Sequence, residues 1–254
     1  MKLVSLNVWG ASCGQILMDY IKNLSVTTDI FCLQEVFSSL PGAPEVSSGA
    51  RMFLFEELSR LLPEFNGFFE IRAAGWDFEG KVNGPVSHGL AVFVKNNLRV
   101  KSVNGKLIAI VDHYPDRWVK AQVVQLESQG KDLAVVNFHG ISKPGDKLDT
   151  PERLDQSKKL GEIWNSLQGG KILIGDFNLD PNTESLKMLA GLGKNLIAEF
   201  NIKNTRNEVS WSRHESKQMF ADYAFTSGDI KVKGFEVPYN EVSDHLPMIL
   251  EFEL

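Results

Sequence analysis

The sequence predicts an α/β fold of the α+β type, a four-layer sandwich in which two mixed β-sheets pack on each other and helices cover their outer faces. Helical periodicity occurs before and after the middle of the chain, at residues 16–24, 53–62 and 151–167, whereas residues 66–139 contain short segments of strand character. A regular alternation of strands and helices would instead predict one parallel sheet. The β-rich middle therefore favours two packed sheets.

Each predicted element follows from its local pattern. Apolar residues spaced three and four apart predict helices, and short apolar runs bounded by Gly, Pro, Asn or Ser predict strands. Asn104-Gly105 and Gln129-Gly130 are residue pairs typical of hairpin turns. In chain order we expect strand 3–8, helix 16–24, strand 29–36, helix 53–62, strands 67–71, 89–94, 107–111, 119–126 and 133–138, helix 151–167, strand 171–175, helix 183–189, and strands 220–226, 230–237 and 248–252.

Length and composition limit the class of protein. The 254 residues, 43% hydrophobic and 23% charged, predict one globular domain over residues 1–254 with a substantial core. The formal net charge of -5 argues against a surface that attracts long polyanions, and it suits a site that collects carboxylates around a cation. Cys13 and Cys32 are too few for a disulfide framework, and no apolar run has the length of a signal peptide or a membrane span. We expect a cytoplasmic protein with reduced thiols, and we assume a monomer.

Polar residues recur at the ends of the predicted strands. Hydrolysis of a phosphate ester requires neutralised phosphate oxygens and an activated water, and cations held by carboxylates contribute to both. Strand ends suit such carboxylates because the backbone there is rigid. Asp176 and Asn178 directly follow one apolar strand, and Glu35 ends another. These positions predict a site for phosphate ester chemistry.

Taken singly, each polar segment also has a simpler explanation. The segment at Asp176 could be an Asx turn, and Glu35 could form an ordinary salt bridge. Ser243-Asp244-His245 could be a surface loop, and His139 could be a structural histidine. Asp222 interrupts a predicted strand, where a carboxylate could orient an imidazole. The recurrence of one pattern at several strand ends favours the functional interpretation of the set.

Together these segments resemble the motifs of the endonuclease/exonuclease/phosphatase superfamily, in the same order along the chain. That superfamily includes deoxyribonucleases, abasic-site endonucleases, tyrosyl-DNA phosphodiesterases, deadenylases, inositol polyphosphate phosphatases and sphingomyelinases. No subfamily matches at every motif. The matching segments are Leu6-Asn7-Val8-Trp9-Gly10, Leu33-Gln34-Glu35-Val36, Asn137-Phe138-His139, Gly175-Asp176-Phe177-Asn178, Ala221-Asp222-Tyr223 and Ser243-Asp244-His245.

The resemblance implies an enzyme that depends on Mg²⁺ or Mn²⁺. By that resemblance Glu35 would bind the metal with help from Asn7. Asp244 would be a second carboxylate on the metal side. The implied metal set is therefore Asn7, Glu35 and Asp244.

The resemblance also implies a set of catalytic residues. Asp176 would orient or deprotonate the attacking water, with support from Asn178. His245, paired with Asp222, would contact the phosphate and stabilise the charge of the transition state. His139 would contact the phosphate or the leaving group. The resemblance leaves open whether Asp176 or His245 is the base.

The expected function is hydrolysis of phosphate esters, first of all a phosphodiesterase acting on nucleic acid or a nucleic-acid adduct. A sphingomyelinase-like enzyme, an inositol or nucleotide phosphatase, and a catalytically silent module that binds a phosphorylated ligand are the alternatives. Trp76 and Phe78 lie in a predicted loop, residues 72–88, whose aromatic side chains could stack on a base or could pack on the loop itself. Basic residues after His139 could contact phosphate or could be solvated, namely Lys143, Lys147 and Arg153.

Overall fold

The structure, a computed structural model, describes residues 1–110, 118–212 and 217–254. Its strands are β1 (Lys2–Asn7), β2 (Ile30–Ser39), β3 (Val46–Ser47), β4 (Ala50–Arg51), β5 (Phe65–Ala74), β6 (Val86–Lys95), β7 (Arg99–Ile110), β8 (Trp118–Ser128), β9 (Lys131–His139), β10 (Gly170–Asp176), β11 (Lys194–Asn195), β12 (Asp222–Thr226), β13 (Lys231–Glu236) and β14 (Met248–Glu253). Its helices are η1 (Trp9–Ala11), α1 (Gln15–Ser25), α2 (Leu54–Leu61), α3 (Pro151–Ser166), α4 (Glu184–Ala190), α5 (Leu196–Glu199) and α6 (Glu208–Trp211).

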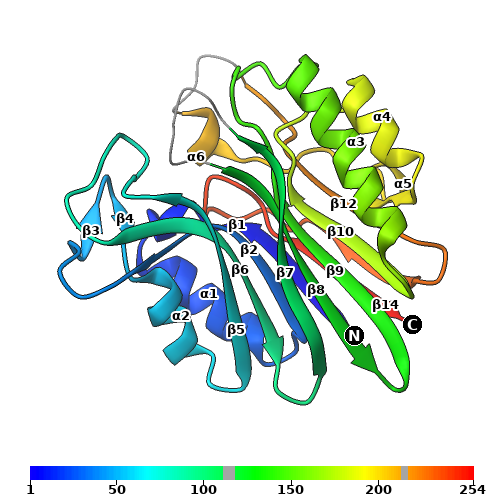
Figure 1. Cartoon of the computed structure of the whole chain (residues 1–254), viewed down its shortest axis with the longest axis horizontal. Helices are drawn as coiled ribbons and strands as arrows, with labels where there is room; N and C mark the ends of the chain where they lie inside the picture. Colours follow the sequence, from blue (N-terminus) through cyan, green and yellow to red (C-terminus); the bar gives the residue numbers. More distant parts are fainter. Residues whose placement is uncertain (111–117, 213–216) are drawn as a thin grey trace.

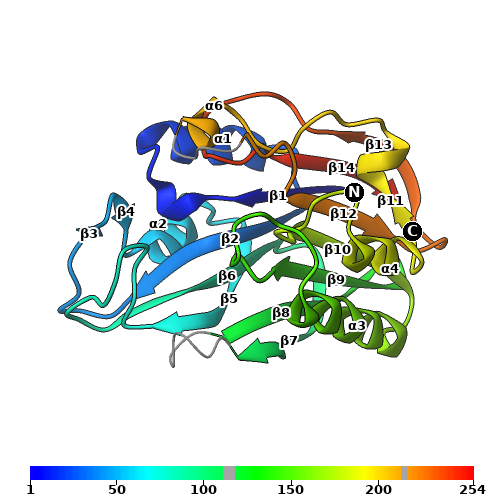
Figure 2. The ribbon, with the colours of Figure 1, turned by 90° about the horizontal axis from the view of Figure 1, so that it is seen from above.

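Two six-stranded mixed sheets pack on each other, with helices on their outer sides (Figure 1). The first sheet has the strand order β13-β14-β1-β2-β6-β5, and the second has β11-β12-β10-β9-β8-β7. Seen from above, α1 and α2 lie on the side of the first sheet and α3 and α4 on the side of the second (Figure 2). The predicted four-layer sandwich of two mixed sheets is confirmed. None of the helices in the described ranges is long and apolar enough to cross a membrane.

Strand β2 illustrates how the layers form. Phe31 and Leu33 pack in one apolar cluster with residues of α1 and α2. Ile30 and Cys32 belong instead to the cluster between the sheets. Because successive side chains of a strand point to opposite faces, a strand covered on both faces needs apolar residues at every position. This is why the buried strands have continuous apolar runs in the sequence.

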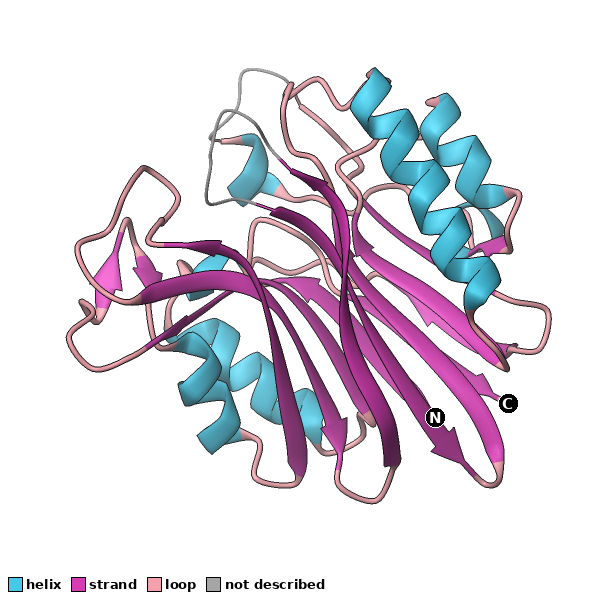
Figure 3. Cartoon of the chain, in the orientation of Figure 1, coloured by secondary structure: helices cyan, strands magenta, loops and turns pink. Residues whose placement is uncertain are grey.

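The expected helices and most expected strands agree with the structure within a few residues at each end, and Figure 3 shows their distribution. Gln129-Gly130 forms the predicted turn between β8 and β9. The turn predicted at Asn104-Gly105 is wrong, because both residues lie inside β7, where Gly105 pairs with Gln122. A side chain on Gly105 would overlap the Glu70 carboxylate. The close approach of Glu70 to the backbone explains why this position is a glycine. The strand predicted at 107–111 corresponds to the second half of β7, and Val111 lies outside the described residues.

The strand directions bring six strand ends to one edge of the sandwich. β1 pairs in parallel with β2, and β9 pairs in parallel with β10, so these four strands end on the same side of their sheets. β14 and β12 run antiparallel to β1 and β10, so these two begin there. In the second sheet Asp176 is the register partner of both His139 and Asp222. The topology alone therefore collects polar residues that are far apart in the sequence.

Gly175, just before Asp176, lies very close to the backbone of the neighbouring strand β9. Its φ is 141°, and a side chain there would overlap the backbone carbonyl oxygen of Phe138 in β9. We predict that Gly175→Ala lowers the free energy of unfolding by roughly 2–4 kcal/mol, because strain and overlap add. Urea unfolding measures this. Gly228→Ala is the control, since a side chain at exposed Gly228 meets nothing within 4 Å; equal losses in the two variants would contradict the prediction.

Candidate active site

Asp176 lies at the centre of the candidate site. Its Oδ2 accepts a hydrogen bond of 3.1 Å from Nδ2 of Asn7, which belongs to the other sheet. The same oxygen lies 3.6 Å from Nε2 of His139 and 3.7 Å from Nε2 of His245. Burial opposes ionisation of this carboxyl, but the charges of His245, Lys147 and Arg206 outweigh it and lower the pKa of Asp176. An ionised, buried carboxylate is thus held among an amide and two imidazoles.

A local turn orients the Asp176 carboxylate. Its Oδ1 accepts a hydrogen bond of 2.9 Å from the backbone N–H of Asn178, whose φ is 53°. The backbone N–H of Phe177 donates to the carbonyl of Ala221 at 2.8 Å, which fixes the turn to the segment before β12. The Asx turn considered from the sequence is therefore present. It occupies Oδ1 and directs Oδ2 towards Asn7 and the two histidines.

Glu35 reaches the site from a β-bulge. The pairing of β2 with β6 shifts register between Gln34 and Val36, and Glu35 has a φ of 56°. Its Oε1 lies 3.7 Å from Nε2 of His139, and within the described residues Glu35 has no ion pair with Lys or Arg. Burial raises the pKa of Glu35 to about 7, and the nearby Asp244 carboxylate adds to the effect. The ordinary salt bridge considered from the sequence is not observed.

His245 and Asp222 form a buried pair. Nδ1 of His245 lies 2.9 Å from Oδ2 of Asp222, so the ring turns its Nε2 towards Asp176. Burial by itself would lower the pKa of His245, but the Asp222 carboxylate, supported by Asp244, raises it to about 9. Asp222 begins β12, where the sequence had suggested an interrupted strand. The ring is thus a cation with one fixed orientation.

Asp244 has a partner that the sequence analysis missed. Nη2 of Arg206 donates to Oδ2 of Asp244 at 3.1 Å, and both side chains are nearly buried. The backbones of Arg206 and His245 form an antiparallel bridge, and Thr205 Oγ1 accepts hydrogen bonds from the backbone N–H groups of Ala221 and Asp222. The segment around Arg206 has neither helical nor strand periodicity, so the sequence offered no signal beyond a polar loop.

Lys147 also belongs to the site, and Arg153 does not. The Lys147 side chain is buried, and its ammonium contacts Oδ1 of Asn178. Arg153, predicted to bind substrate, is fully buried, and its guanidinium donates to the backbone carbonyls of Leu148 and Pro144. That prediction is wrong, because Arg153 has no surface to offer a ligand. It instead holds the loop that presents Lys147.

The two aromatic residues predicted to face the substrate lie in the segment between β5 and β6. Phe78 packs against Phe37 and His88, with ring centroids 5.2 Å and 5.7 Å away, in a small apolar cluster. This agrees with the alternative that the loop packs on its own contacts. Trp76 lies under Nζ of Lys81, 5.5 Å from the ring centroid. A substrate contact for Trp76 stays a prediction.

The oxygen atoms at the edge suit a hard divalent cation. Glu35 and Asp244 offer carboxylate oxygens and Asn7 an amide oxygen, which are ligands of Mg²⁺ and Mn²⁺. Glu35 lacks a compensating Lys or Arg among the described residues, and a cation would supply the missing positive charge. Asp176, Asp222 and His245 also place ligand atoms within 4.8 Å of one another. Because His245 and Asp222 already bond each other, Glu35 is the better candidate for a primary ligand.

The pairing of Arg206 with Asp244 generates a prediction about stability. Arg206→Ala leaves a buried carboxylate without its cation, and we expect a loss of roughly 3 kcal/mol in the free energy of unfolding. Lys194→Ala is the control, because the Lys194–Glu199 pair is exposed and its loss should cost less than about 1 kcal/mol. Adding Asp244→Asn to Arg206→Ala should restore part of the loss. Equal losses for Arg206→Ala and Lys194→Ala in urea unfolding would refute this account.

Comparison with solved structures identifies proteins of the same fold. The whole chain superposes on 71% of an endonuclease/exonuclease/phosphatase from Beutenbergia cavernae with a TM-score of 0.72 and 19% identity. It likewise matches, over its full length, all of a mannosyl-6-phosphatase from Bacteroides thetaiotaomicron (TM-score 0.70, 17% identity) and 99% of D. rerio TDP2 complexed with a single strand DNA product (TM-score 0.71, 14% identity). At these identities the likeness establishes the fold alone.

Comparison at the level of sequence gives the family. A search of curated proteins finds no match. The sequence model of the endonuclease/exonuclease/phosphatase family matches residues 4–245, a span that includes every residue of the site described above. The chain therefore belongs to the endonuclease/exonuclease/phosphatase family.

Proposed function

We propose that this protein is a hydrolase of phosphate esters that uses a divalent cation, Mg²⁺ or Mn²⁺. The observation that carries the proposal is the surroundings of Asp176, whose Oδ2 lies within 3.7 Å of donor atoms of Asn7, His139 and His245. An ionised carboxylate beside a cationic imidazole provides an acceptor for the proton of water and a positive charge for a phosphate oxygen. Because both sheets supply this site, we infer that residues 1–254 act as one domain.

The cation would be held by Glu35 and Asp244, with the amide oxygen of Asn7. When bound, it would neutralise charge on the non-bridging oxygens of the phosphate. His245, oriented by Asp222, would donate Nε2–H to a phosphate oxygen. Asp176 would hold the attacking water and accept its proton.

Two further groups are suited to contact the substrate. Nδ2 of Asn178 and Nδ1 of His139 are buried atoms with no hydrogen-bond partner in the described ranges. An unsatisfied buried polar atom costs free energy unless a ligand completes its hydrogen bonding. Burial lowers the pKa of His139, so its ring is neutral and one of its nitrogens can donate to a phosphate oxygen or to the leaving group. We assign Asn178 to the phosphate and His139 to the phosphate or the leaving group.

For the substrate, we infer a phosphodiester of nucleic acid or of a nucleic-acid adduct as the first candidate. The similarity in fold to TDP2 complexed with a single strand DNA product supports it. The similarity to a mannosyl-6-phosphatase supports a phosphomonoester as the second candidate. Turnover of single-stranded DNA, abasic DNA, 5′-tyrosyl DNA, oligo(A), sphingomyelin and sugar phosphates, measured side by side, separates these classes.

Removal of the metal tests the cofactor. We predict that EDTA abolishes hydrolysis of bis-p-nitrophenyl phosphate and that excess Mg²⁺ or Mn²⁺ restores it. Glu35→Gln should raise the metal concentration needed for half-maximal rate by about tenfold or more, because it removes a charged ligand. Glu162→Gln, on the exposed face of α3, should leave that concentration unchanged. Full activity in EDTA would exclude the metal.

Loss of the central residues tests the catalytic assignment. We predict that Asp176→Ala and His245→Ala each lower kcat for the same substrate at least about a hundredfold, because they remove the acceptor for the proton of water and the positive charge. Circular dichroism should report a folded chain in both variants. Asp155→Asn, an exposed change on α3, is the control for loss of a carboxylate. Retained activity in both alanine variants would refute the assignment.

A further inference from the structure

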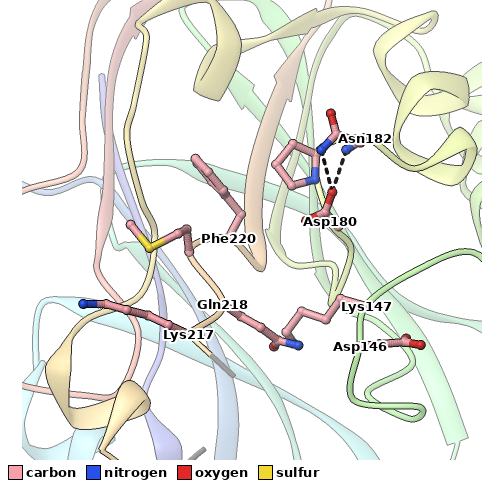
Figure 4. A pocket seen from close by; sticks show the side chains of 9 residues that line it. Asp146, Lys147, Asp180, Asn182, Lys217, Gln218 and Phe220 are labelled. Atoms are coloured by element: carbon pink, nitrogen blue, oxygen red, sulfur yellow. Dashed lines mark hydrogen bonds between the residues drawn. The ribbon is translucent and has the colours of Figure 1, made fainter. Parts of the chain in front are cut away.

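Lys147 is a buried lysine whose ammonium faces a neutral group. It lies in the loop between β9 and α3, and its side chain extends away from the exposed neighbour Asp146 (Figure 4). Lys147 is 5% exposed, its Nζ donates to Oδ1 of Asn178, and within the described ranges it forms no ion pair with Asp or Glu. Burial lowers the pKa of Lys147, and the Asp176 and Asp222 carboxylates oppose this effect. A buried charge without a charged partner is costly, so this lysine is kept at the expense of stability.

The backbone around Lys147 is fixed on both sides. Its φ is 61°, a left-handed conformation that is uncommon for a residue with a side chain. Its carbonyl accepts a hydrogen bond of 2.9 Å from the backbone N–H of Asp180, which follows β10. Nη1 of the buried Arg153 donates to the carbonyl of Leu148 at 2.5 Å and to Oδ1 of Asp146 at 3.4 Å. These bonds to both flanking residues direct the Lys147 side chain inward.

Asn178, the partner of this ammonium, is held in a similar way. It also has a left-handed φ, 53°, and its backbone N–H donates to Oδ1 of Asp176 at 2.9 Å. Its Oδ1 is occupied by Lys147, and its Nδ2 is buried without a hydrogen-bond partner in the described part of the chain. The remaining freedom of this side chain is a half-turn about its last torsion, which exchanges Oδ1 and Nδ2.

Lys147 decides that half-turn. The two ends of a side-chain amide have nearly the same shape, but the oxygen only accepts hydrogen bonds and the nitrogen only donates them. An ammonium donates and does not accept, so it selects the orientation in which Oδ1 of Asn178 faces it. Nδ2 is then left as a donor for a ligand. The opposite orientation would offer an oxygen to a phosphate oxygen, and two acceptors repel each other.

We propose that Lys147 is a positioning residue of the phosphoesterase, which holds the Asn178 amide so that Nδ2 donates to the phosphate. The ammonium also strengthens this donor, because a charged hydrogen bond to Oδ1 polarises the amide in the protein interior. A carboxylate partner would cancel the charge of the lysine, whereas a neutral amide leaves it effective. The inference rests on the proposed function and adds a residue that acts through Asn178.

Removal of the ammonium tests this role. Lys147→Met nearly keeps the length of the side chain and removes the donor, so kcat/KM for bis-p-nitrophenyl phosphate should fall about tenfold or more. Lys158→Met is the control, because Lys158 is exposed on α3, and it should leave kcat/KM unchanged. Equal values of kcat/KM for the two variants would overturn the inference.

A second substitution separates positioning from direct contact with the phosphate. Asn178→Gly removes the amide and keeps a backbone that favours positive φ. If Lys147 acts through Asn178, adding Lys147→Met to Asn178→Gly should lower kcat/KM by less than about twofold further. A further loss as large as that caused by Lys147→Met alone would show that the ammonium acts independently of Asn178, and this result would overturn the inference.

Urea unfolding distinguishes positioning from support of the loop. The midpoint for Lys147→Met should not fall below that of the unmodified chain, because an apolar side chain replaces a buried charge. If the lysine only supports the loop, the midpoint falls and kcat/KM falls by the same factor with and without Asn178. That pair of results would overturn the inference.

The two proposals fail in different ways. Absence of hydrolysis of bis-p-nitrophenyl phosphate by the unmodified chain with Mg²⁺ or Mn²⁺ overturns the proposed function. In that case calorimetry with inorganic phosphate and Mg²⁺ still tests the donor at Asn178. An increase of about tenfold in Kd on Lys147→Met, absent in the Asn178→Gly background, would support the positioning role. Equal Kd values for Lys147→Met and Lys158→Met, or no binding by the unmodified chain, would overturn it.

Discussion

The site depends on polar contacts between the two sheets at the edge where their strands end. The hydrogen bond from Asn7 to Asp176 joins β1 of the first sheet to β10 of the second. Beside it, Nε2 of Gln34 donates to Oδ1 of Asn137 at 2.7 Å, and Nδ2 of Asn137 donates to the carbonyl of Leu33 at 3.1 Å. Apolar packing between sheets has no strong register of its own, whereas buried hydrogen bonds do. These contacts therefore fix how the strand ends of one sheet lie against those of the other.

The charges at this edge are arranged unevenly, and this distinguishes the roles of the carboxylates. Asp244 is neutralised by Arg206, and Asp222 is paired with His245. Asp176 lies among groups that favour its ionised form. Glu35 has no ion pair with Lys or Arg among the described residues, and burial, followed by the neighbouring Asp244 carboxylate, raises its pKa to about 7. This difference supports the proposal that Glu35 is a ligand of the cation.

The residues around this edge lie mainly on loops and turns held by their own hydrogen bonds. Arg153 holds the loop of Lys147 through backbone carbonyls, and an Asx turn at Asp180 orders the segment that follows β10. Thr205 and Arg206 tie the start of β12 to the segment that carries Asp244 and His245. A rigid sandwich supports these segments, and the loops vary the chemistry presented at its edge.

The sequence by itself determined the fold class, most elements and most of the polar residues that meet at this edge, because strand and helix periods and polar residues at strand ends are local signals. Only the tertiary structure decided which neighbours each side chain has. Arg153 resembled a phosphate contact, but its side chain is buried and bonds backbone carbonyls. Gly105 resembled a turn residue, but it leaves space for the Glu70 carboxylate. Arg206, which pairs with Asp244, gave no local signal. Their roles depend on residues distant in the chain, and local periodicity carries no information about such contacts.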